Sequence, residues 1–379
     1  WPGFMLKPLL LGLGRRVLGT RSTMGLAAQG AAIGGLAALA AVLQGCGSSS
    51  PAPSPSPAPG PPANPSVRLA NGVMMPLVSA GTWQYNDSQA AATVEAALAV
   101  GYTHIDTAFD YNNQAGVGTG LKASGKARGE VFITSKVPGC GLQGVKDCYK
   151  DTARIIREDI RLLGSTGYPA EYLDLILIHF PPCKGESVLQ CAANHTGCDP
   201  DKCEQVQDQW RALTEAYEAK LVRAVGVSNY CSGCFKCLEG WSVKPMVNQV
   251  QLHVGMGADP QGFVSFAQKW GTVLQAWSPL GSGGHGDSEI LTGGLTTGIA
   301  AAHQKTAAQV ALKWILAHNV TLSTKSSSRK HLTENLGLFD FELTAEEMQK
   351  LDAADFHKAD NPSFMCRDAS PAAYADMVI

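Results

Sequence analysis

The chain has 379 residues, of which 45% are hydrophobic and 16% are charged, and its formal net charge at pH 7 is −2. This length and hydrophobic content suffice for one large core or two modest domains. A net charge so close to zero gives no indication of a nucleic-acid partner. The charge is unevenly spread, however, because residues 1–65 contain basic side chains and no Asp or Glu.

Residues 1–46 have the composition of a targeting segment. Basic residues precede an apolar, small-residue run over 25–43, which ends in Leu-Gln-Gly before Cys46. This order is typical of a secretory signal. A retained membrane anchor, a bacterial lipoprotein signal with Cys46 as the lipidated residue, and an organelle transit peptide stand as alternatives. Residues 47–66 alternate Pro, Ala and Ser, which favours extended polyproline II and predicts a linker.

The cysteine content points to an oxidising compartment. The chain has 11 cysteines, and ten lie beyond the leader, several of them in clusters. Asn-X-Ser/Thr sequons begin at Asn86, Asn194 and Asn319. Together with the leader, these features predict the secretory pathway or the extracellular space, with an organelle or the cytoplasm as the alternative.

From residue 67 onward, apolar runs alternate with longer amphipathic stretches. The first feature is the Asn71-Gly72 pair within 67–76, which predicts a β-hairpin. Strands are then expected at about 78–80, 102–106, 131–135, 173–178, 222–227, 246–250, 272–276 and 320–323. Helices are expected at about 88–99, 114–124, 147–163, 205–219, 232–239, 260–270, 304–317 and 329–336.

Eight strand–helix units predict a (β/α)8 barrel over 67–351, followed by a tail at 352–379. The rival fold is an open doubly wound sheet, which usually has a Gly-rich phosphate loop after its first strand. Here the first strand continues into Gly-Thr-Trp at 81–83, which is not such a loop. Two long connections, 181–204 and a Gly-rich one at 278–303, are expected at the catalytic end of the barrel.

Four polar residues lie at or just after the carboxyl ends of consecutive expected strands. Asp106 ends the second strand, and Tyr111 lies in the loop after it. Lys136 ends the third strand, and His179 ends the fourth. Each residue alone has a structural explanation, such as a helix cap or a packing aromatic. Because strand ends of a parallel barrel meet at one face, the four together predict a proton-transfer site.

Seven segments, in the same order, resemble the aldo-keto reductases, and the match covers 67–351. They are Asp-Thr-Ala-Phe-Asp-Tyr at 106–111, Ile-Thr-Ser-Lys at 133–136, Leu-Ile-His-Phe-Pro at 177–181, Val-Gly-Val-Ser-Asn-Tyr at 225–230, Asn-Gln-Val at 248–250, Ala-Trp-Ser-Pro-Leu-Gly at 276–281 and Glu-Asn at 334–335. The resemblance implies NAD(P)H-dependent reduction of aldehydes or ketones. Tyr111 would donate the proton, Asp106 would hold Lys136 charged, and His179 would align the carbonyl oxygen. We expect the Lys136 ammonium to lower the pKa of the Tyr111 phenol.

The resemblance also implies contacts to NADPH, or alternatively to NADH. Ser228, Asn229 and Gln249 would bind the nicotinamide carboxamide, and Trp277 would stack on the ring. The other implied contacts are Ser278, Leu280 and Ser282 at the pyrophosphate, Lys325 and Ser326 at the 2′-phosphate and ribose, and Glu334 and Asn335 near the adenine. The implied walls of the substrate pocket are Trp83, Phe109 and Phe180, for which core packing is the alternative.

One position departs from the family pattern. Six residues after Lys325 the family commonly has an arginine beside the adenine and the 2′-phosphate, and this chain has His331. Imidazole is shorter than guanidinium and mostly neutral at pH 7, so this phosphate contact is expected to be weaker. The sequence therefore predicts only a modest preference for NADPH over NADH.

The cysteines lie outside the family's usual pattern. Cys231, Cys234 and Cys237 recur at helical spacing, but a zinc site would need a fourth ligand and tetrahedral thiolates. We expect no metal and favour disulfides. The candidate pairs are Cys140 with Cys148, and pairs among Cys183, Cys191, Cys198 and Cys203.

The expected function is that of a monomeric NADP-dependent oxidoreductase acting on a small-molecule carbonyl substrate. The alternative is a cofactor-binding regulatory or interaction subunit on the same fold, with little turnover. The four polar residues favour the enzyme, because a binding role does not require Tyr111, Lys136 and His179 together. The N-terminal segment leaves membrane attachment open.

Overall fold

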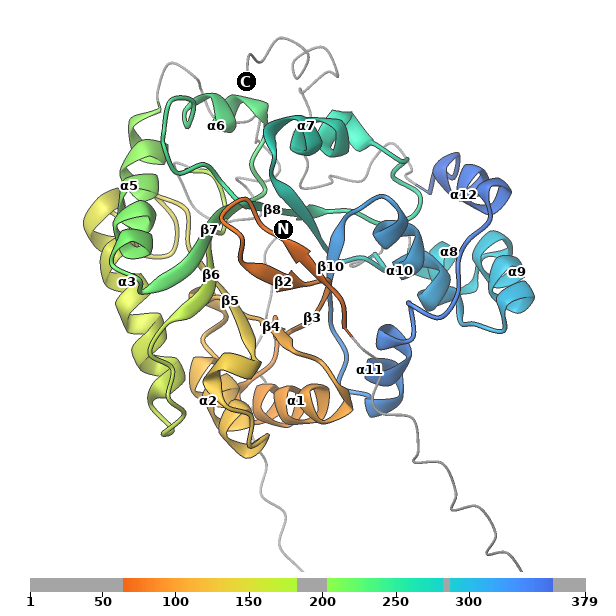
Figure 1. Cartoon of the computed structure of the whole chain (residues 1–379), viewed down its shortest axis with the longest axis horizontal. Helices are drawn as coiled ribbons and strands as arrows, with labels where there is room; N and C mark the ends of the chain where they lie inside the picture. The colour runs from red at the N-terminus through yellow and green to blue at the C-terminus, as the bar shows by residue number, and fades with distance from the viewer. Residues whose placement is uncertain (1–63, 183–202, 282–286, 357–379) are drawn as a thin grey trace, which may run out of the picture. The chain divides into compact units, whose positions relative to one another are not determined.

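The computed structural model describes residues 64–182, 203–281 and 287–356. Eight parallel strands close into a barrel in which each strand pairs with its neighbours along the chain and the last pairs with the first (Figure 1). The strands are β3 (Val78–Gly81), β4 (His104–Asp106), β5 (Phe132–Val137), β6 (Leu173–Ile178), β7 (Val222–Ser228), β8 (Val247–Gln251), β9 (Val273–Trp277) and β10 (Thr321–Thr324). The predicted (β/α)8 barrel is therefore confirmed, and the expected strands agree closely with the observed ones.

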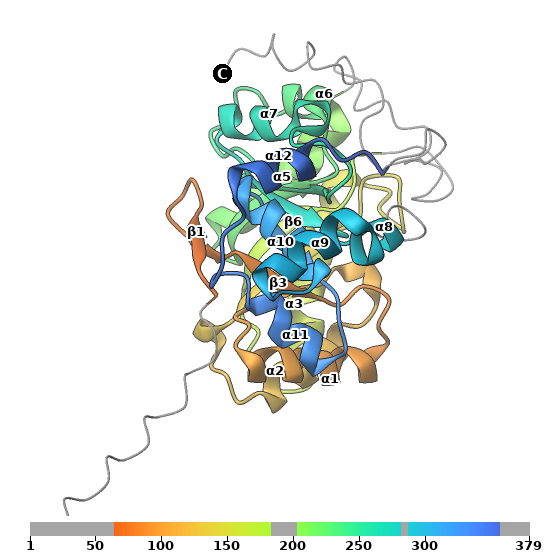
Figure 2. The same ribbon diagram turned by 90° about the vertical axis from the view of Figure 1, so that its right-hand side faces the viewer.

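The predicted β-hairpin is also present and closes the amino-terminal end of the barrel. Its strands β1 (Ser66–Arg68) and β2 (Met74–Pro76) are antiparallel, and Gly72 in the turn has a φ of 88°, which glycine adopts without strain. Asn71 Nδ2 donates to the carbonyl oxygen of Arg223 at 2.8 Å, near the start of β7. The hairpin crosses the barrel in Figure 1 and projects from one end in Figure 2. The carboxyl ends of the strands lie at the other end.

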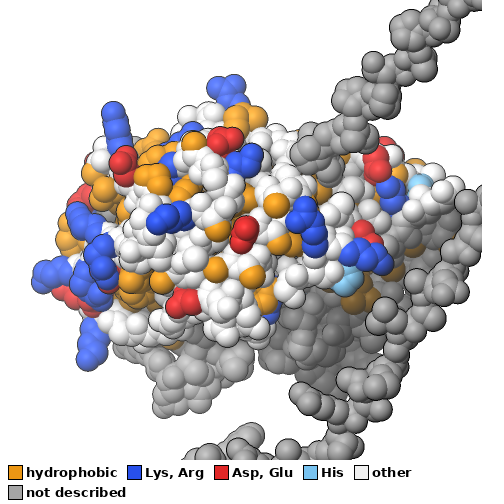
Figure 3. All heavy atoms as spheres, turned by 90° about the horizontal axis from the view of Figure 1, so that it is seen from below, with side chains coloured by type: hydrophobic (Ala, Val, Ile, Leu, Met, Phe, Trp, Pro, Cys, Tyr) orange, Lys and Arg blue, Asp and Glu red, His pale blue; other side chains and the backbone are white. Residues whose placement is uncertain are grey.

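The connecting helices form an outer layer around the barrel. The expected ones are α1 (Asp87–Val100), α2 (Gln114–Ala123), α3 (Cys148–Gly164), α5 (Glu204–Glu218), α6 (Ser232–Lys236), α7 (Phe263–Trp270), α10 (Ala307–Ala317) and α11 (Arg329–Leu336). N-capping side chains fix where several of these helices begin. The Thr306 side chain accepts a hydrogen bond from the backbone N–H of Gln309, so α10 begins at 307 and not at the expected 304. Figure 3 shows one side of this layer, where basic and acidic side chains lie among hydrophobic ones.

Among the described residues, three further helices were not expected. The Gly-rich connection at 278–303 contains α8 (Asp287–Thr292) and α9 (Gly294–His303), and α12 (Ala345–Asp352) follows α11. Ile299 and Ala300 of α9 are buried, so packing offsets the low helix propensity of its glycines. Within the described ranges, none of the helices is long and apolar enough to span a membrane.

A buried ion network holds together the starts of the strands that carry the candidate site. Asp174 of β6 accepts from Arg128 at 2.7 Å, from Arg223 of β7 at 2.6 Å and from the backbone N–H of Ile133 in β5 at 2.9 Å. The Asp174 side chain is only 1% exposed. Because both carboxylate oxygens are bonded, the network fixes β5, β6 and β7 side by side.

The described cysteines form disulfides. Cys140 pairs with Cys148, as predicted, and Cys203 pairs with Cys237, a pair that was not predicted. Cys231 and Cys234 are also disulfide-bonded. Zinc binding by the cluster at 231–237 is therefore not supported, because zinc requires thiolates. In the described part of the chain, no cluster of His, Cys, Asp or Glu could hold a metal ion. Cys183, Cys191 and Cys198 lie outside the described residues.

Candidate active site

The four polar residues singled out in the sequence do meet at the carboxyl end of the barrel. Asp106 is the last residue of β4, and Tyr111 ends the short 3-10 helix η1 (Phe109–Tyr111) that follows. Lys136 lies near the end of β5, and His179 comes directly after β6. The neighbouring registers of β4, β5 and β6 bring these positions together.

Lys136 is the centre of the site. Its Nζ donates to Oδ1 of Asp106 at 2.6 Å and to the carbonyl oxygen of Thr107 at 3.0 Å, and it lies 3.3 Å from the Tyr111 hydroxyl oxygen. The Lys136 side chain is 0% exposed. Burial alone would lower the pKa of Lys136, but Asp106 and Tyr111 outweigh it and raise that pKa. The ammonium therefore stays charged although it is enclosed.

The Tyr111 phenol differs from the expectation. Burial raises its pKa to about 12, and Asp106 and Asp110 add to the rise, while Lys136 opposes it. Lys136 does lower the pKa of Tyr111, as expected, but the net shift is upward because one ammonium does not outweigh desolvation and two carboxylates. Tyr111 consequently holds its proton at neutral pH.

Asp110 is a site residue that the sequence analysis did not single out. Its Oδ1 lies 2.9 Å from Nδ1 of His179, and the two side chains are 8% and 10% exposed. The His179 ring also meets Tyr111 edge-on, with ring centroids 5.7 Å apart, and stacks on Phe180 at 4.6 Å. The signal in the sequence was the position of Asp110 beside Tyr111, but only the folded chain brings it against His179, which directly follows β6.

Neutral hydrogen-bonding groups line the neighbouring strand ends. The Asn229 side chain donates to Ser228 Oγ at 3.1 Å and to the backbone oxygen of His179 at 3.0 Å, and it accepts from Trp277 Nε1 at 3.0 Å. Gln249 Nε2 donates to Asp106 Oδ2 at 2.7 Å and to another amide, Gln275 Oε1, at 2.7 Å. We refer to the amide side chains of Asn229, Gln249 and Gln275 as the amide layer. Through Gln249 this layer is hydrogen-bonded directly to the Asp106–Lys136 pair.

The other residues expected at a cofactor lie along the same end of the barrel or are not described. Ser278 and Leu280 follow β9, whereas Ser282 lies outside the described residues. Lys325 and Ser326 follow β10, and Lys325 Nζ donates to Gln84 Oε1 at 2.8 Å. On α11, His331 is exposed, Glu334 is half-buried beside Lys330 and Asn335 is buried.

The three expected pocket walls have different surroundings. Phe109 and Phe180 are half-buried, and Phe180 stacks on His179. Trp83 is 49% exposed and lies 5.9 Å from Lys325 Nζ, measured to its ring centroid. Trp83 is therefore an accessible aromatic surface, whereas Phe180 is part of the support for the imidazole.

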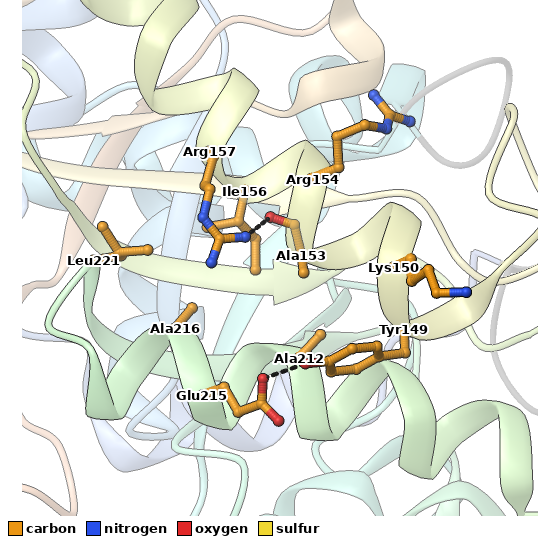
Figure 4. A pocket seen from close by; sticks show the side chains of 10 residues that line it. All are labelled: Tyr149, Lys150, Ala153, Arg154, Ile156, Arg157, Ala212, Glu215, Ala216 and Leu221. Atoms are coloured by element: carbon orange, nitrogen blue, oxygen red, sulfur yellow. Dashed lines mark hydrogen bonds between the residues drawn. The ribbon is translucent and has the colours of Figure 1, made fainter.

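A hollow of about 480 Å³ between α3 and α5 is separate from this site (Figure 4). Tyr149 donates to Glu215 across it at 2.5 Å, and Arg157 donates to the backbone oxygen of Ala153 at 2.8 Å. Its lining residues are Tyr149, Lys150, Ala153, Arg154, Ile156, Arg157, Ala212, Glu215, Ala216 and Leu221. Since none of them is one of the four polar site residues, the chemistry is placed at the strand ends and not in this hollow.

Comparison with known proteins agrees with this geometry. Residues 68–355 match the model of the Aldo/keto reductase family. The chain belongs to the aldo-keto reductase family. It is 38% identical over 290 residues to the glyoxal reductase of Bacillus subtilis, covering 76% of this chain and 92% of that protein. It is 36% identical over 291 residues to the 9,11-endoperoxide prostaglandin H2 reductase of Trypanosoma cruzi, covering 76% and 90%.

Solved aldo-keto reductases have the same fold. An enzyme from a Medee basin deep-sea metagenome library is 30% identical with a TM-score of 0.66, covering 79% of this chain and 98% of its own. A mutant of Gox0644 in complex with NADPH is 29% identical with a TM-score of 0.63, covering 77% and 94%. Membership of the family makes this aldo-keto reductase an oxidoreductase that uses a nicotinamide cofactor in carbonyl reduction.

Proposed function

We propose that this aldo-keto reductase reduces an aldehyde or ketone to the alcohol with NADPH, and that Tyr111 donates the proton. The observation that carries the proposal is the contact of Lys136 Nζ with both Asp106 and the Tyr111 hydroxyl. A buried ammonium beside the hydroxyl stabilises the tyrosinate that remains after proton transfer. The high pKa of Tyr111, about 12, does not prevent this step, because an alkoxide is a much stronger base than a tyrosinate.

The amide layer fits a nicotinamide. Both hydrogens of the Gln249 amide are donated to protein oxygens, so its Oε1 would accept from the carboxamide of the cofactor. Ser228 and Asn229 would complete the contacts, and Trp277 would lie against the ring. When bound, the reduced cofactor supplies a hydride to the carbonyl carbon. Lys325 and Ser326 would meet the 2′-phosphate and ribose.

The chemistry of the substrate follows from the aromatic walls. Phe109, Phe180 and the exposed Trp83 suit a carbonyl compound with hydrophobic substituents. The two relatives named above act, by their names, on very different compounds, so neither name identifies the substrate of this chain.

The test is steady-state turnover of an aromatic aldehyde with NADPH and with NADH, together with cofactor binding measured by tryptophan fluorescence. We expect wild-type turnover, and a loss of about 10²–10⁴-fold in kcat for Tyr111→Phe with cofactor affinity unchanged. If Tyr111→Phe keeps most of the wild-type kcat, Tyr111 is not the proton donor. Cofactor binding without turnover by the wild type would instead support a regulatory subunit.

A further inference from the structure

Gln275 is a buried amide of the barrel interior that the proposed chemistry does not use. It pairs with Gln249 in the register of β8 and β9, and it is 0% exposed. Its Oε1 accepts a hydrogen bond from Gln249 Nε2 at 2.7 Å. Its own Nε2 has no hydrogen-bond partner among the described residues. A buried donor without a partner destabilises the folded state, so this amide adds less to stability than a fully bonded one.

The orientation of both amides follows from Asp106. The Asp106 carboxylate, which is paired with Lys136, can only accept, so Gln249 must turn Nε2 toward Asp106 Oδ2, at 2.7 Å. The second hydrogen of Gln249 Nε2 then needs an acceptor, which Gln275 Oε1 supplies. Turning the Gln275 amide over would bring two NH₂ groups together. The unpartnered Nε2 of Gln275 is therefore a consequence of the hydrogen bond that its Oε1 accepts.

The hydrogen bond to Gln275 fixes the plane of the Gln249 amide. With the bond to Asp106 alone, that amide could rotate about the bond, and its Oε1 would have no single direction. Two hydrogen bonds from one NH₂ group remove this rotation. The backbone of Gln249 is already held, because its oxygen accepts from Ser228 Oγ at 2.8 Å and from the Asn229 N–H at 2.9 Å. Only the direction of the Gln249 side-chain oxygen therefore depends on Gln275.

We propose that Gln275 is a positioning residue for the cofactor, which orients the Gln249 amide so that its Oε1 accepts from the carboxamide of the nicotinamide. This inference rests on the proposed contact between Gln249 and the cofactor. An acceptor that is already oriented loses less freedom when the cofactor binds, so the affinity is higher. Gln275 acts through Gln249 and needs no contact of its own with the cofactor.

The test compares Gln275→Met with the wild type, because methionine is also unbranched and flexible but lacks the amide. Gln209→Met on α5 is the matched control. Gln209 is likewise a buried amide, but it donates to the backbone oxygen of Pro138 at 3.0 Å and accepts from the Cys140 N–H at 2.7 Å. Urea unfolding reports on stability. Calorimetry gives Kd for NADPH and for adenosine 2′,5′-bisphosphate, which has the adenine and the 2′-phosphate but no nicotinamide.

In Gln275→Met we expect Kd for NADPH to rise about five- to tenfold and Kd for the bisphosphate to stay unchanged. The urea midpoint should stay close to the wild-type value, because an unpartnered donor is removed while one hydrogen of Gln249 loses its acceptor. Gln209→Met should instead lower the midpoint and leave both Kd values unchanged. An unchanged Kd for NADPH in Gln275→Met would overturn the positioning role. So would an equal rise in both Kd values, since the effect would then not lie at the carboxamide.

A double-variant cycle shows whether Gln275 acts through Gln249. In the Gln249→Met background, adding Gln275→Met should leave Kd for NADPH unchanged, because the amide that Gln275 orients is gone. A further rise as large as that in the single variant would reject the proposal. If the wild type does not bind NADPH, the proposed function fails and this inference fails with it. Binding by the wild type that Gln275→Met leaves unchanged rejects the positioning role alone.

Discussion

Lys136 and Asp106 form an ion pair, with 2.6 Å between Nζ and Oδ1, that the fold encloses almost completely. Asp106 Oδ2 also accepts from Gln249, so both carboxylate oxygens are bonded. The same pair that orients the Tyr111 hydroxyl is therefore part of the barrel interior. Replacing one partner alone should affect stability and activity together, because it leaves the other charge buried without compensation.

We expect Lys136→Met to lower the free energy of unfolding by about 3–5 kcal/mol and to abolish carbonyl reduction. The double variant Lys136→Met/Asp106→Asn removes both charges, so it should recover most of the stability without recovering activity. Urea unfolding and steady-state kinetics of the two variants provide the check. Equal stability of the single and double variants would show that the uncompensated charge of Asp106 does not destabilise the Lys136→Met protein.

Asp159 on α3 should make stability fall with rising pH. Burial raises the pKa of its carboxyl to about 7, and the neighbouring Ser135 and Gln114 side chains lower that pKa by less. Between about pH 4 and 7 the folded protein keeps this proton while the unfolded chain releases it. Stability from this group is therefore complete at low pH and is lost as pH rises to about 7.

Asp159→Asn should remove this pH dependence, because the amide stays neutral. At pH 8 the variant should be more stable than the wild type by about 3–4 kcal/mol, and at pH 4 the two should be similar. The measurement is the unfolding free energy at both pH values. Asp208→Asn, which changes a partly exposed carboxylate paired with Arg211, is the control and should leave the wild-type dependence intact.

Much of the site could be predicted because strand ends are visible in the sequence. Asp106, Lys136 and His179 each end or follow an apolar run, and a closed parallel barrel leaves one face for such positions. Asp110 could not be predicted, since its contact depends on the 3-10 turn η1 and on the left-handed Asn112 that ends it. The net direction of the pKa shift of Tyr111 could not be predicted either, because it depends on burial and on two carboxylates as well as on Lys136.

The remaining differences have a similar origin in tertiary packing. The glycines of residues 278–303 favour a loop, but α9 is helical and buries Ile299 and Ala300. The Cys203–Cys237 pair joins the start of α5 to the end of α6, which are brought together by the neighbouring strands β6 and β7. Sequence separation alone favoured pairs within one loop.

The two described disulfides should differ in their contribution to stability. Their sequence separations are 34 residues for Cys203–Cys237 and 8 for Cys140–Cys148. Loop-closure entropy gives about 4 kcal/mol for the longer loop and about 2–3 kcal/mol for the shorter one. Thermal unfolding of Cys203→Ser/Cys237→Ser and Cys140→Ser/Cys148→Ser should show the larger loss for the first pair. The reverse order would mean that native-state packing, and not chain entropy, dominates.

Cofactor choice should depend on His331 in the α11 helix and on Lys325, which directly follows β10. NADPH and NADH differ only in the 2′-phosphate, so discrimination requires cations near that group. Lys325 is tethered by Gln84, and His331 is exposed on the first turn of α11, where Ser328 Oγ accepts from its backbone N–H. A guanidinium is always charged and can bind phosphate with two hydrogen bonds, whereas the shorter imidazole ring offers no such pair.

We therefore expect a modest NADPH preference, and a further gain in His331→Arg. A gain of about 1–2 kcal/mol corresponds to about a five- to thirtyfold change in the ratio of kcat/KM for the two cofactors. Thr333→Arg is the matched control, because it adds the same charge to an exposed position of the same helix two residues later. If His331→Arg alters the ratio no more than Thr333→Arg does, position 331 does not contact the 2′-phosphate.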